Sequence, residues 1–212
     1  MQRHSWIVTF DLGNVVVRLS GSTRESAKRA GIPWRPATHA ERPEQASHLL
    51  ERWQLGQIDD DRLFEAWADA LGGRFSAAEA EIISQAWLLG EFEGIHDIIQ
   101  RLDQRHVRLG CLSNTCNHHW QWMLNHPDRF PSFALLHEKH ASHLMGVMKP
   151  DPSIYARFEQ AVGHQASNIV FFDDILGNVA AAKAQGWHAF LISPQCPPSE
   201  QIGSALHQLE LL

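Results

Sequence analysis

The sequence predicts an α/β protein in which helices cover a parallel β-sheet. Short apolar runs rich in β-branched residues alternate with helical patterns over much of the 212-residue chain, and this alternation favours parallel strands joined by right-handed crossovers. Polar residues follow three of these runs directly, at Asp11, Ser113 and Asp173. Open α/β sheets bind their ligands at the carboxyl ends of their strands. We therefore expect a doubly wound sheet with a ligand site along one edge.

The first predicted strand covers residues 6–10 and ends at Asp11. Its residues are apolar or β-prone, which is typical of a strand buried on both faces. Gly13 and Asn14 form a strong turn signal, and a second β-branched run follows at residues 15–17. Asp11 thus lies at the end of a buried strand and is a catalytic candidate.

The pattern then becomes helical until about residue 94. Residues 44–55 predict a helix with an apolar face, and Asp59 or Asp60 can cap a second helix. Ser76 and Glu79 form a capping box for a third helix. Three amphipathic helices in a row can bury their apolar faces against one another or against the sheet domain.

From residue 95 the alternation of helix and strand resumes. Helices are predicted at 95–105, 118–125, 152–162 and 178–185, and strands at 107–112, 133–137, 169–172 and 188–192. Because the carboxyl ends of parallel strands meet at one edge, residues far apart in the chain can converge there.

Composition narrows the possible partners and compartments. The 18 basic and 24 acidic residues give a net charge of −6, and no Lys/Arg-rich run is present, so nucleic acid is not expected as a partner. No apolar run reaches the ~20 residues that cross a bilayer, and the segment before Trp6 lacks the features of a secretory signal. We expect a cytoplasmic protein.

The three cysteines show no CxxC spacing, so neither a disulfide framework nor a zinc site is indicated.

Four motifs, taken together, resemble a known family. They are Phe-Asp-Leu-Gly-Asn-Val at 10–15, Leu-Ser-Asn-Thr at 112–115, Lys-Pro at 149–150 and Phe-Phe-Asp-Asp at 171–174. In order and spacing they resemble the motifs of the haloacid dehalogenase (HAD) superfamily of phosphohydrolases. Their individual residues also resemble those of its α-D-glucose-1-phosphatase branch. The resemblance implies a Rossmann-like core at 1–20 and 95–212 with an inserted all-helical cap at 21–94.

The same resemblance implies a Mg²⁺-dependent phosphatase that acts on a small phosphorylated metabolite through an aspartyl-phosphate. Asp11 would be the nucleophile, and Lys149 would pair with it and with the phosphate. The implied metal ligands are Asp11, the backbone carbonyl of Gly13, Asp173 and Asp174. The implied phosphate-binding residues are Leu12, Gly13, Ser113, Asn114 and Lys149.

One position departs from most phosphatases of the superfamily. They carry a second aspartate, a general acid and base, where this chain has Gly13. Its absence favours leaving groups that need little protonation, namely a sugar 1-phosphate such as glucose 1-phosphate, a phenol or an acyl phosphate; we expect the first. The glucose-1-phosphatase branch also lacks this aspartate. His118 or His119 could serve as the base, or water could act unaided, although a solvated helix start is the more usual role for either histidine.

Substrate contacts are expected from the cap. We predict that Trp53 and His48, together with the loop at 34–42, line the cleft, whereas the helical spacing of Trp67 and Trp87 favours a place in the cap core.

Other interpretations remain open at this point. Taken singly, Asp11 could be a turn residue, Ser113 a helix cap, Lys149 an exposed lysine and Asp173-Asp174 a helix start. The same nucleophile could hydrolyse a carbon–halogen bond, as in haloacid dehalogenases, which need no metal and lack the paired acids. A decayed enzyme that only binds a metabolite is the non-catalytic alternative. We expect a monomer or a small homo-oligomer.

Overall fold

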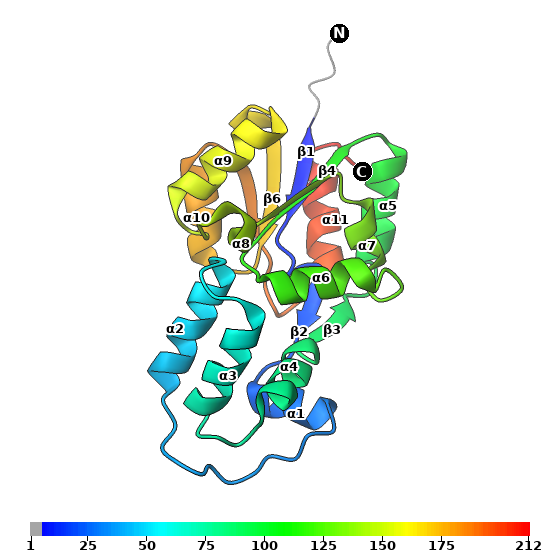
Figure 1. The fold of residues 1–212 in the computed structure, drawn as a ribbon. Helices are drawn as coiled ribbons and strands as arrows, with labels where there is room; N and C mark the ends of the chain where they lie inside the picture. Colours follow the sequence, from blue (N-terminus) through cyan, green and yellow to red (C-terminus); the bar gives the residue numbers. More distant parts are fainter. Residues whose placement is uncertain (1–5) are drawn as a thin grey trace.

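The computed structural model describes residues 6–212, so the prediction made for the segment before Trp6 lies outside the described residues. A five-stranded parallel sheet has the strand order β5-β4-β1-β6-β7 and carries a separate group of helices beside it (Figure 1). The predicted α/β fold with a helical insertion is confirmed. The strands of this sheet are β1 (Ile7–Phe10), β4 (Arg108–Ser113), β5 (Glu138–Ala141), β6 (Ile169–Asp173) and β7 (His188–Leu191).

Strand β1 is the central strand of the sheet, and its burial is complete on both faces. Val8 and Phe10 face one hydrophobic cluster, and Ile7 belongs to the cluster on the other face. In the register of the sheet, Phe10 lies beside Cys111 of β4 and Phe172 of β6. The residues that follow these three strands therefore meet at one edge.

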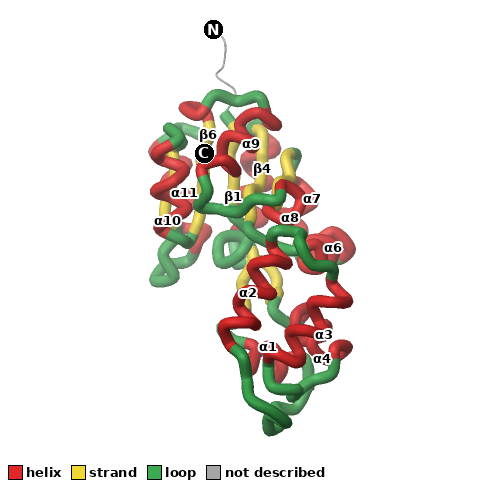
Figure 2. Tube along the Cα trace, turned by 60° about the vertical axis from the view of Figure 1, so that its left-hand side comes forward, coloured by secondary structure: helices red, strands yellow, loops and turns green. Residues whose placement is uncertain are grey.

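Helices cover both faces of the sheet (Figure 2). Apolar residues of α5 (Ile95–Gln104) and α11 (Pro198–Gln208) fill the cluster on one face. Those of α9 (Pro152–Val162) and α10 (Leu176–Ala184) fill the other. A short 3₁₀ turn at Ala166–Asn168 precedes β6.

The inserted helices form a further hydrophobic cluster, apart from the two on the faces of the sheet. They are α1 (Thr23–Arg29), α2 (Pro43–Gln54), α3 (Asp60–Ala70) and α4 (Ala77–Gln85). Trp53, Leu63 and Trp67 are buried among them. Asp59 caps α3 by accepting a hydrogen bond from the backbone of Arg62. We refer to α1–α4 as the cap; its limits at residues 21 and 94 stay a prediction.

Two short strands connect the cap to the sheet domain. Strand β2 (Val17–Leu19) pairs antiparallel with β3 (Leu88–Glu91), and this ribbon lies between the two parts in Figure 1. The chain thus enters and leaves the cap through one narrow connection.

The predicted strand at residues 133–137 is wrong. Pro131 stands in the first turn of a short helix, α7 (Pro131–Leu135), and the buried Phe133 packs edge-on against Trp120 with ring centroids 4.9 Å apart. The strand begins only at Glu138. Helices α6 (Asn117–Asn125) and α8 (Ser142–Met145) complete this region.

None of the helices among residues 6–212 is both long and apolar enough to cross a membrane.

Candidate active site

Asp11 follows β1 directly and is fixed at the centre of the sheet edge. Its backbone N–H donates to the Phe172 carbonyl at 2.8 Å, and the residue is only 8% exposed. Burial raises the pKa of the Asp11 carboxyl to about 6, although the nearby Lys149 opposes this rise. Ser113, buried at the end of β4, also lowers the pKa of this carboxyl.

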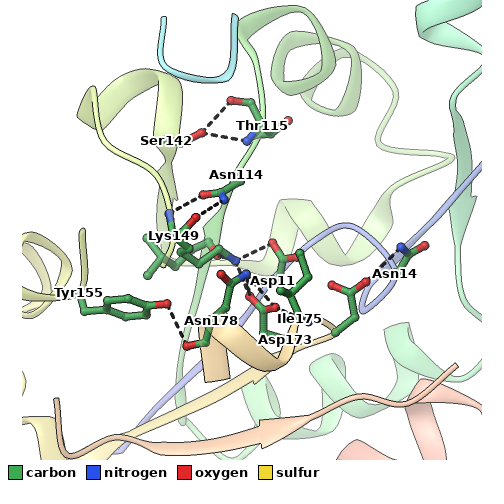
Figure 3. A network of polar contacts seen from close by, with 12 residues as sticks. Asp11, Asn14, Asn114, Thr115, Ser142, Lys149, Tyr155, Asp173, Ile175 and Asn178 are labelled. Atoms are coloured by element: carbon green, nitrogen blue, oxygen red, sulfur yellow. Dashed lines mark hydrogen bonds and ion pairs between the residues drawn. The ribbon is translucent and has the colours of Figure 1, made fainter. Parts of the chain in front are cut away.

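Lys149 places a buried ammonium group between two carboxylates (Figure 3). Its Nζ lies 3.0 Å from Asp11 Oδ1 and 2.6 Å from Asp173 Oδ2, and it donates to the Leu112 carbonyl at 2.7 Å. Burial lowers the pKa of the ammonium, but the two carboxylates more than compensate, so the pKa is raised. The predicted ion pair with Asp11 is present, and Lys149 is not an exposed helix-start residue.

Asn114 holds Lys149 in place. Its Oδ1 accepts from the Lys149 backbone N–H at 2.9 Å, and its Nδ2 donates to the Lys149 carbonyl at 2.8 Å. The side chain of Asn114 is therefore occupied, and the predicted contact with phosphate concerns its backbone amide. Sequence reasoning did not anticipate this clamp, since the two residues lie 35 positions apart.

Asp173 is completely buried and its oxygens are fully bonded. Oδ2 accepts from Lys149, Oδ1 accepts from the Ile175 backbone N–H at 2.8 Å, and Asn178 Nδ2 donates to both oxygens at 3.0 Å. Asn178, one turn into α10, is a supporting residue that the sequence analysis did not name. Its position soon after the Asp pair, on the following helix, was the available signal.

Asp174 is half-buried, unlike the completely buried Asp173 beside it. Its Oδ2 accepts from Asn14 Nδ2 at 3.1 Å, and burial raises the pKa of its carboxyl. Asn14 has a positive φ of 55°, so the Gly13-Asn14 turn also orients a side chain in the site. This contact was not predicted.

Oxygens of Asp11, Asp173 and Asp174 lie within 4.8 Å of one another. Three carboxylates against the one ammonium of Lys149 leave excess negative charge, and carboxylate oxygens are the ligands that Mg²⁺ prefers. The cluster could therefore hold a metal ion. Because the oxygens of Asp173 are bonded to protein groups, Asp11 and Asp174 are the better placed of the three to contact it directly.

Gly13 lies against the side chain of Leu19. A Cβ atom at this position would lie 2.9 Å from Cδ1 of Leu19, so a side chain here would require Leu19 to shift. Where most phosphatases of the resembled superfamily carry their second aspartate, this chain has a glycine with an aliphatic neighbour.

A cavity of about 180 Å³ lies between the cap and the sheet domain. Leu12, Gly13, Ser113 and Asn114 line its floor, so it adjoins the predicted phosphate-binding residues. The remaining lining residues are Val17, Leu19, Leu50, Trp53, Gln54, Trp67, Ser84, Trp87, Leu88, Thr115, Cys116, His119 and Met123. Trp53 therefore lines the cavity as predicted, and His119, considered above as a base, lines it as well.

Predictions for three other parts of the cleft have mixed outcomes. Trp67 packs in the cap core as predicted and also lines the cavity, whereas Trp87 follows α4, lines the cavity and is not part of the cap cluster. His48 lies outside the cavity, with a side chain 68% exposed near Glu51. The loop at 34–42 runs along α3 and α4, where Thr38 N–H donates to the Gly72 carbonyl at 2.8 Å.

His119 is neutral at physiological pH. Its Nε2 lies 2.9 Å from Ser84 Oγ and 3.0 Å from the Ser84 carbonyl, and burial lowers the pKa of the ring to about 4. The neighbouring His118 packs against Phe64 with ring centroids 5.1 Å apart, and burial also lowers its pKa. Both rings belong to the packing between α6 and the cap.

Comparison with known proteins gives a family and a fold. A family model described as haloacid dehalogenase-like hydrolase matches residues 7–186. A phosphatase of Mycobacterium tuberculosis (strain CDC 1551 / Oshkosh) is 36% identical over 52 residues, which is 24% of this chain and 24% of that protein. The chain thus matches about a quarter of the length of this curated relative.

Solved structures resemble the chain over most of its length. A HAD-like family hydrolase of Porphyromonas gingivalis has a TM-score of 0.76 at 21% identity, covering 98% of each chain. A magnesium complex of a HAD family enzyme of Bacteroides thetaiotaomicron has a TM-score of 0.73 at 19% identity, covering 90% of this chain and 94% of that one. A 2-haloacid dehalogenase of Pseudomonas syringae pv. Tomato has a TM-score of 0.63 at 18% identity, covering 96% and 99%. At these identities the likeness shows the fold alone.

Proposed function

This chain belongs to the haloacid dehalogenase-like hydrolases, and from that premise we propose that it is a Mg²⁺-dependent phosphomonoesterase acting on a small phosphorylated metabolite. The observation that carries the proposal is the grouping of Asp11, Asp173 and Asp174 within 4.8 Å around the buried Lys149. A buried nucleophile, a fixed positive charge and a set of oxygen ligands are the groups that phosphoryl transfer to a carboxylate requires.

Charge balance supports a bound cation. The three carboxylates outnumber the single ammonium of Lys149, and a phosphate ester adds further negative charge. A bound Mg²⁺ would reduce the repulsion between the Asp11 carboxylate and the phosphoryl oxygens. We expect Asp11, Asp174 and the Gly13 carbonyl to contact the ion, with Asp173 holding Lys149 beside them. A phosphate complex and a magnesium complex are both known for the Bacteroides thetaiotaomicron enzyme, which supports the same pairing here.

The residues of the site then divide the work of hydrolysis. A carboxylate oxygen of Asp11 attacks phosphorus, the bond from phosphorus to the ester oxygen breaks, and that oxygen keeps the electron pair and takes a proton from water. Lys149 Nζ and the Ser113 hydroxyl donate to phosphoryl oxygens. Water next attacks phosphorus of the aspartyl-phosphate, releasing inorganic phosphate and restoring the Asp11 carboxylate.

Two alternatives make different use of the same residues. A carbon–halogen hydrolase needs the nucleophile but no cation, so the acidic cluster speaks against it. A module that only binds a metabolite needs no nucleophile, and the buried pair of Asp11 and Lys149 speaks against that. We also propose that the chain belongs to the glucose-1-phosphatase branch. This finer likeness rests on the four motifs and on Gly13.

The test is phosphate release from a panel of phosphate esters with Mg²⁺ or with EDTA, beside chloride release from 2-chloropropionate. We expect Mg²⁺-dependent phosphate release that Asp11→Asn abolishes. Asp128→Asn, at an exposed position outside the cavity, is the matched control and should keep full activity. Chloride release without phosphate release would establish the dehalogenase, and neither activity in a folded protein would establish the binding module.

A further inference from the structure

The cavity beside the phosphate-binding residues carries information about the substrate. Its volume is about 180 Å³. A dry apolar cavity of about 150 Å³ in another protein takes up benzene. The space beside Ser113 and Gly13 therefore suits a leaving group of about one ring.

The cavity wall is mostly hydrocarbon. Leu19 and Leu50 contribute aliphatic surface, and Trp53, Trp67 and Trp87 contribute aromatic surface. Aromatic guests pack favourably against such rings in edge-on or offset arrangements. Among the described residues that line the cavity, none is Asp, Glu, Lys or Arg, so a charged group would enter without a partner.

The cavity offers a small set of hydrogen-bonding groups for the leaving group. Ser84 and His119 already bond to each other. The indole N–H groups of Trp67 and Trp87 can only donate, whereas Gln54 and Thr115, which also line the cavity, can accept as well as donate. A hexose would bring several hydroxyl groups that lose water on entry, and each unpaired one is costly. The wall is therefore poorly matched to a sugar.

The chemistry at Gly13 is compatible with a phenol. Gly13 supplies no general acid, and Leu19 lies beside it, so the departing oxygen must leave with little help from a protonated side chain. Phenols leave readily as phenoxide, whereas aliphatic alcohols need a proton donor. A phenoxide takes a proton from water and becomes a neutral phenol at neutral pH, whereas the carboxylate released from an acyl phosphate stays charged in a cavity without a cation in its wall.

We propose that the substrates are aryl phosphates, in which a compact, uncharged phenol occupies the cavity under the cap. This inference rests on the proposed phosphomonoesterase function and replaces a sugar 1-phosphate as the expected substrate. Gln54 and Thr115 can recognise one polar substituent on the ring, so a phenol with a single hydroxyl, amide or carbonyl substituent would suit the site.

Four substrates separate ring binding from leaving-group chemistry. Phenyl phosphate has both the ring and a good leaving group, benzyl phosphate has the ring alone, acetyl phosphate has a good leaving group without a ring, and glucose 1-phosphate has a polar ring. We expect kcat/KM for phenyl phosphate to exceed each of the others by about tenfold or more, because burying a ring and avoiding unpaired hydroxyls each contribute on that scale. A kcat/KM for glucose 1-phosphate equal to or above that for phenyl phosphate overturns the inference.

Binding of an inert analogue provides a second readout. We expect phenylphosphonate to bind in calorimetry at least about tenfold more tightly than methylphosphonate. Leu50→Phe adds bulk to the cavity wall and should remove most of this difference, whereas Leu124→Phe, 44% exposed on α6 and outside the cavity, should not. Equal affinity of wild type for the two phosphonates overturns the inference.

The two proposals fail in different ways. If none of the four esters gives Mg²⁺-dependent phosphate release that depends on Asp11, the phosphomonoesterase function itself is wrong. If acetyl phosphate or glucose 1-phosphate is hydrolysed in preference to phenyl phosphate, the function stands and only the aryl specificity is wrong.

Discussion

Lys149 separates two buried carboxylates, and its removal leaves both without compensation. We expect Lys149→Met to abolish phosphatase activity and to lower the free energy of unfolding by about 3 to 5 kcal/mol, the range found when one partner of a buried ion pair is removed. Urea unfolding at neutral pH measures the change. The matched control is Arg29→Met, which breaks the exposed pair with Glu25 and should cost less than about 1 kcal/mol.

A double variant checks the cause of this loss. Adding Asp173→Asn to Lys149→Met removes one of the stranded charges, so the two effects should not add. We expect the double variant to be more stable than the sum of the single losses predicts. Strict additivity would show that Lys149 and Asp173 do not stabilise each other, despite the 2.6 Å between their charged atoms.

His119 should make the protein less stable in mild acid. Its pKa is about 4 in the folded state against an ordinary 6.5, so the unfolded chain binds more protons between these two values. Stability from the neutral ring is complete above pH 6.5 and is lost as the pH falls toward 4. When the pH falls from 7 to 4.5, the free energy of unfolding should decrease in both proteins. The decrease should be smaller in His119→Asn than in wild type, by up to about 2 kcal/mol. Urea unfolding at both pH values measures this, and His48→Asn, an exposed histidine, should behave as wild type.

Among single residues, the sequence predicted the charged groups of the site better than the contacts that hold these groups in place. Asp11, Lys149 and the Asp173-Asp174 pair stand in local motifs that mark strand ends and a helix start. The clamp from Asn114 and the wrong placement of His48 depend on how distant segments pack, and neither has a local signal. Leu19 is near Gly13 in the sequence, but the turn that brings them together, with a bridge between Gly13 and Val17, gives no sequence signal for this side-chain contact.

At the level of elements, helix α4 depends on its N-terminal capping box. The Ser76 hydroxyl accepts from the Glu79 backbone N–H at 3.2 Å, and the Glu79 carboxylate accepts from the Ser76 backbone N–H at 2.9 Å. We expect Ser76→Ala to lower the free energy of unfolding by about 1 kcal/mol. Thermal unfolding gives the change, and Ser47→Ala, an exposed serine inside α2, should leave stability unchanged or slightly raised.

Sequence patterns predicted β1, β4, β6 and β7 but missed β5 at one edge of the sheet. Strands β1 and β6 are buried on both faces and are apolar apart from Thr9 and Asp173, so their local sequence suffices. Strand β5 lies at the edge of the sheet with a Glu-Lys-His sequence that is only partly buried. Because β5 is polar, its sequence does not show the apolar pattern of a buried strand. The apolar residues of the preceding helix α7 match that pattern better, so they predict a strand at the wrong place.

For the whole molecule, the contact of the cap with the sheet domain depends on Gly56. This residue follows α2 with a φ of +69°, and a Cβ there would lie 2.6 Å from the His143 carbonyl in α8. We expect Gly56→Ala to push the two parts of the molecule apart, lowering both the stability and the activity toward aryl phosphates. Gly31→Ala is the control, since Gly31 has a φ of +72° and a Cβ there would meet no atom of the described residues within 4 Å.

The comparison of these two variants isolates the contact from the backbone strain. Both place alanine in the left-handed region, which costs about 1 to 2 kcal/mol. We expect Gly56→Ala to lose at least about 1 kcal/mol more than Gly31→Ala in urea unfolding. Equal losses would mean that the cap and α8 adjust freely. No sequence pattern marks the contact between Gly56 and His143, because it joins the end of α2 to α8, which lies far along the chain.

The central position of β1 also orders events during synthesis. Its partners, β4 at residues 108–113 and β6 at residues 169–173, leave the ribosome long after it. The cap helices emerge in between and contact one another locally, so they can associate first. Parallel pairing over such separations is slow to form. The strand that precedes the nucleophile therefore waits with both edges open until β4 has been made, and with one edge open until about four-fifths of the chain has been made.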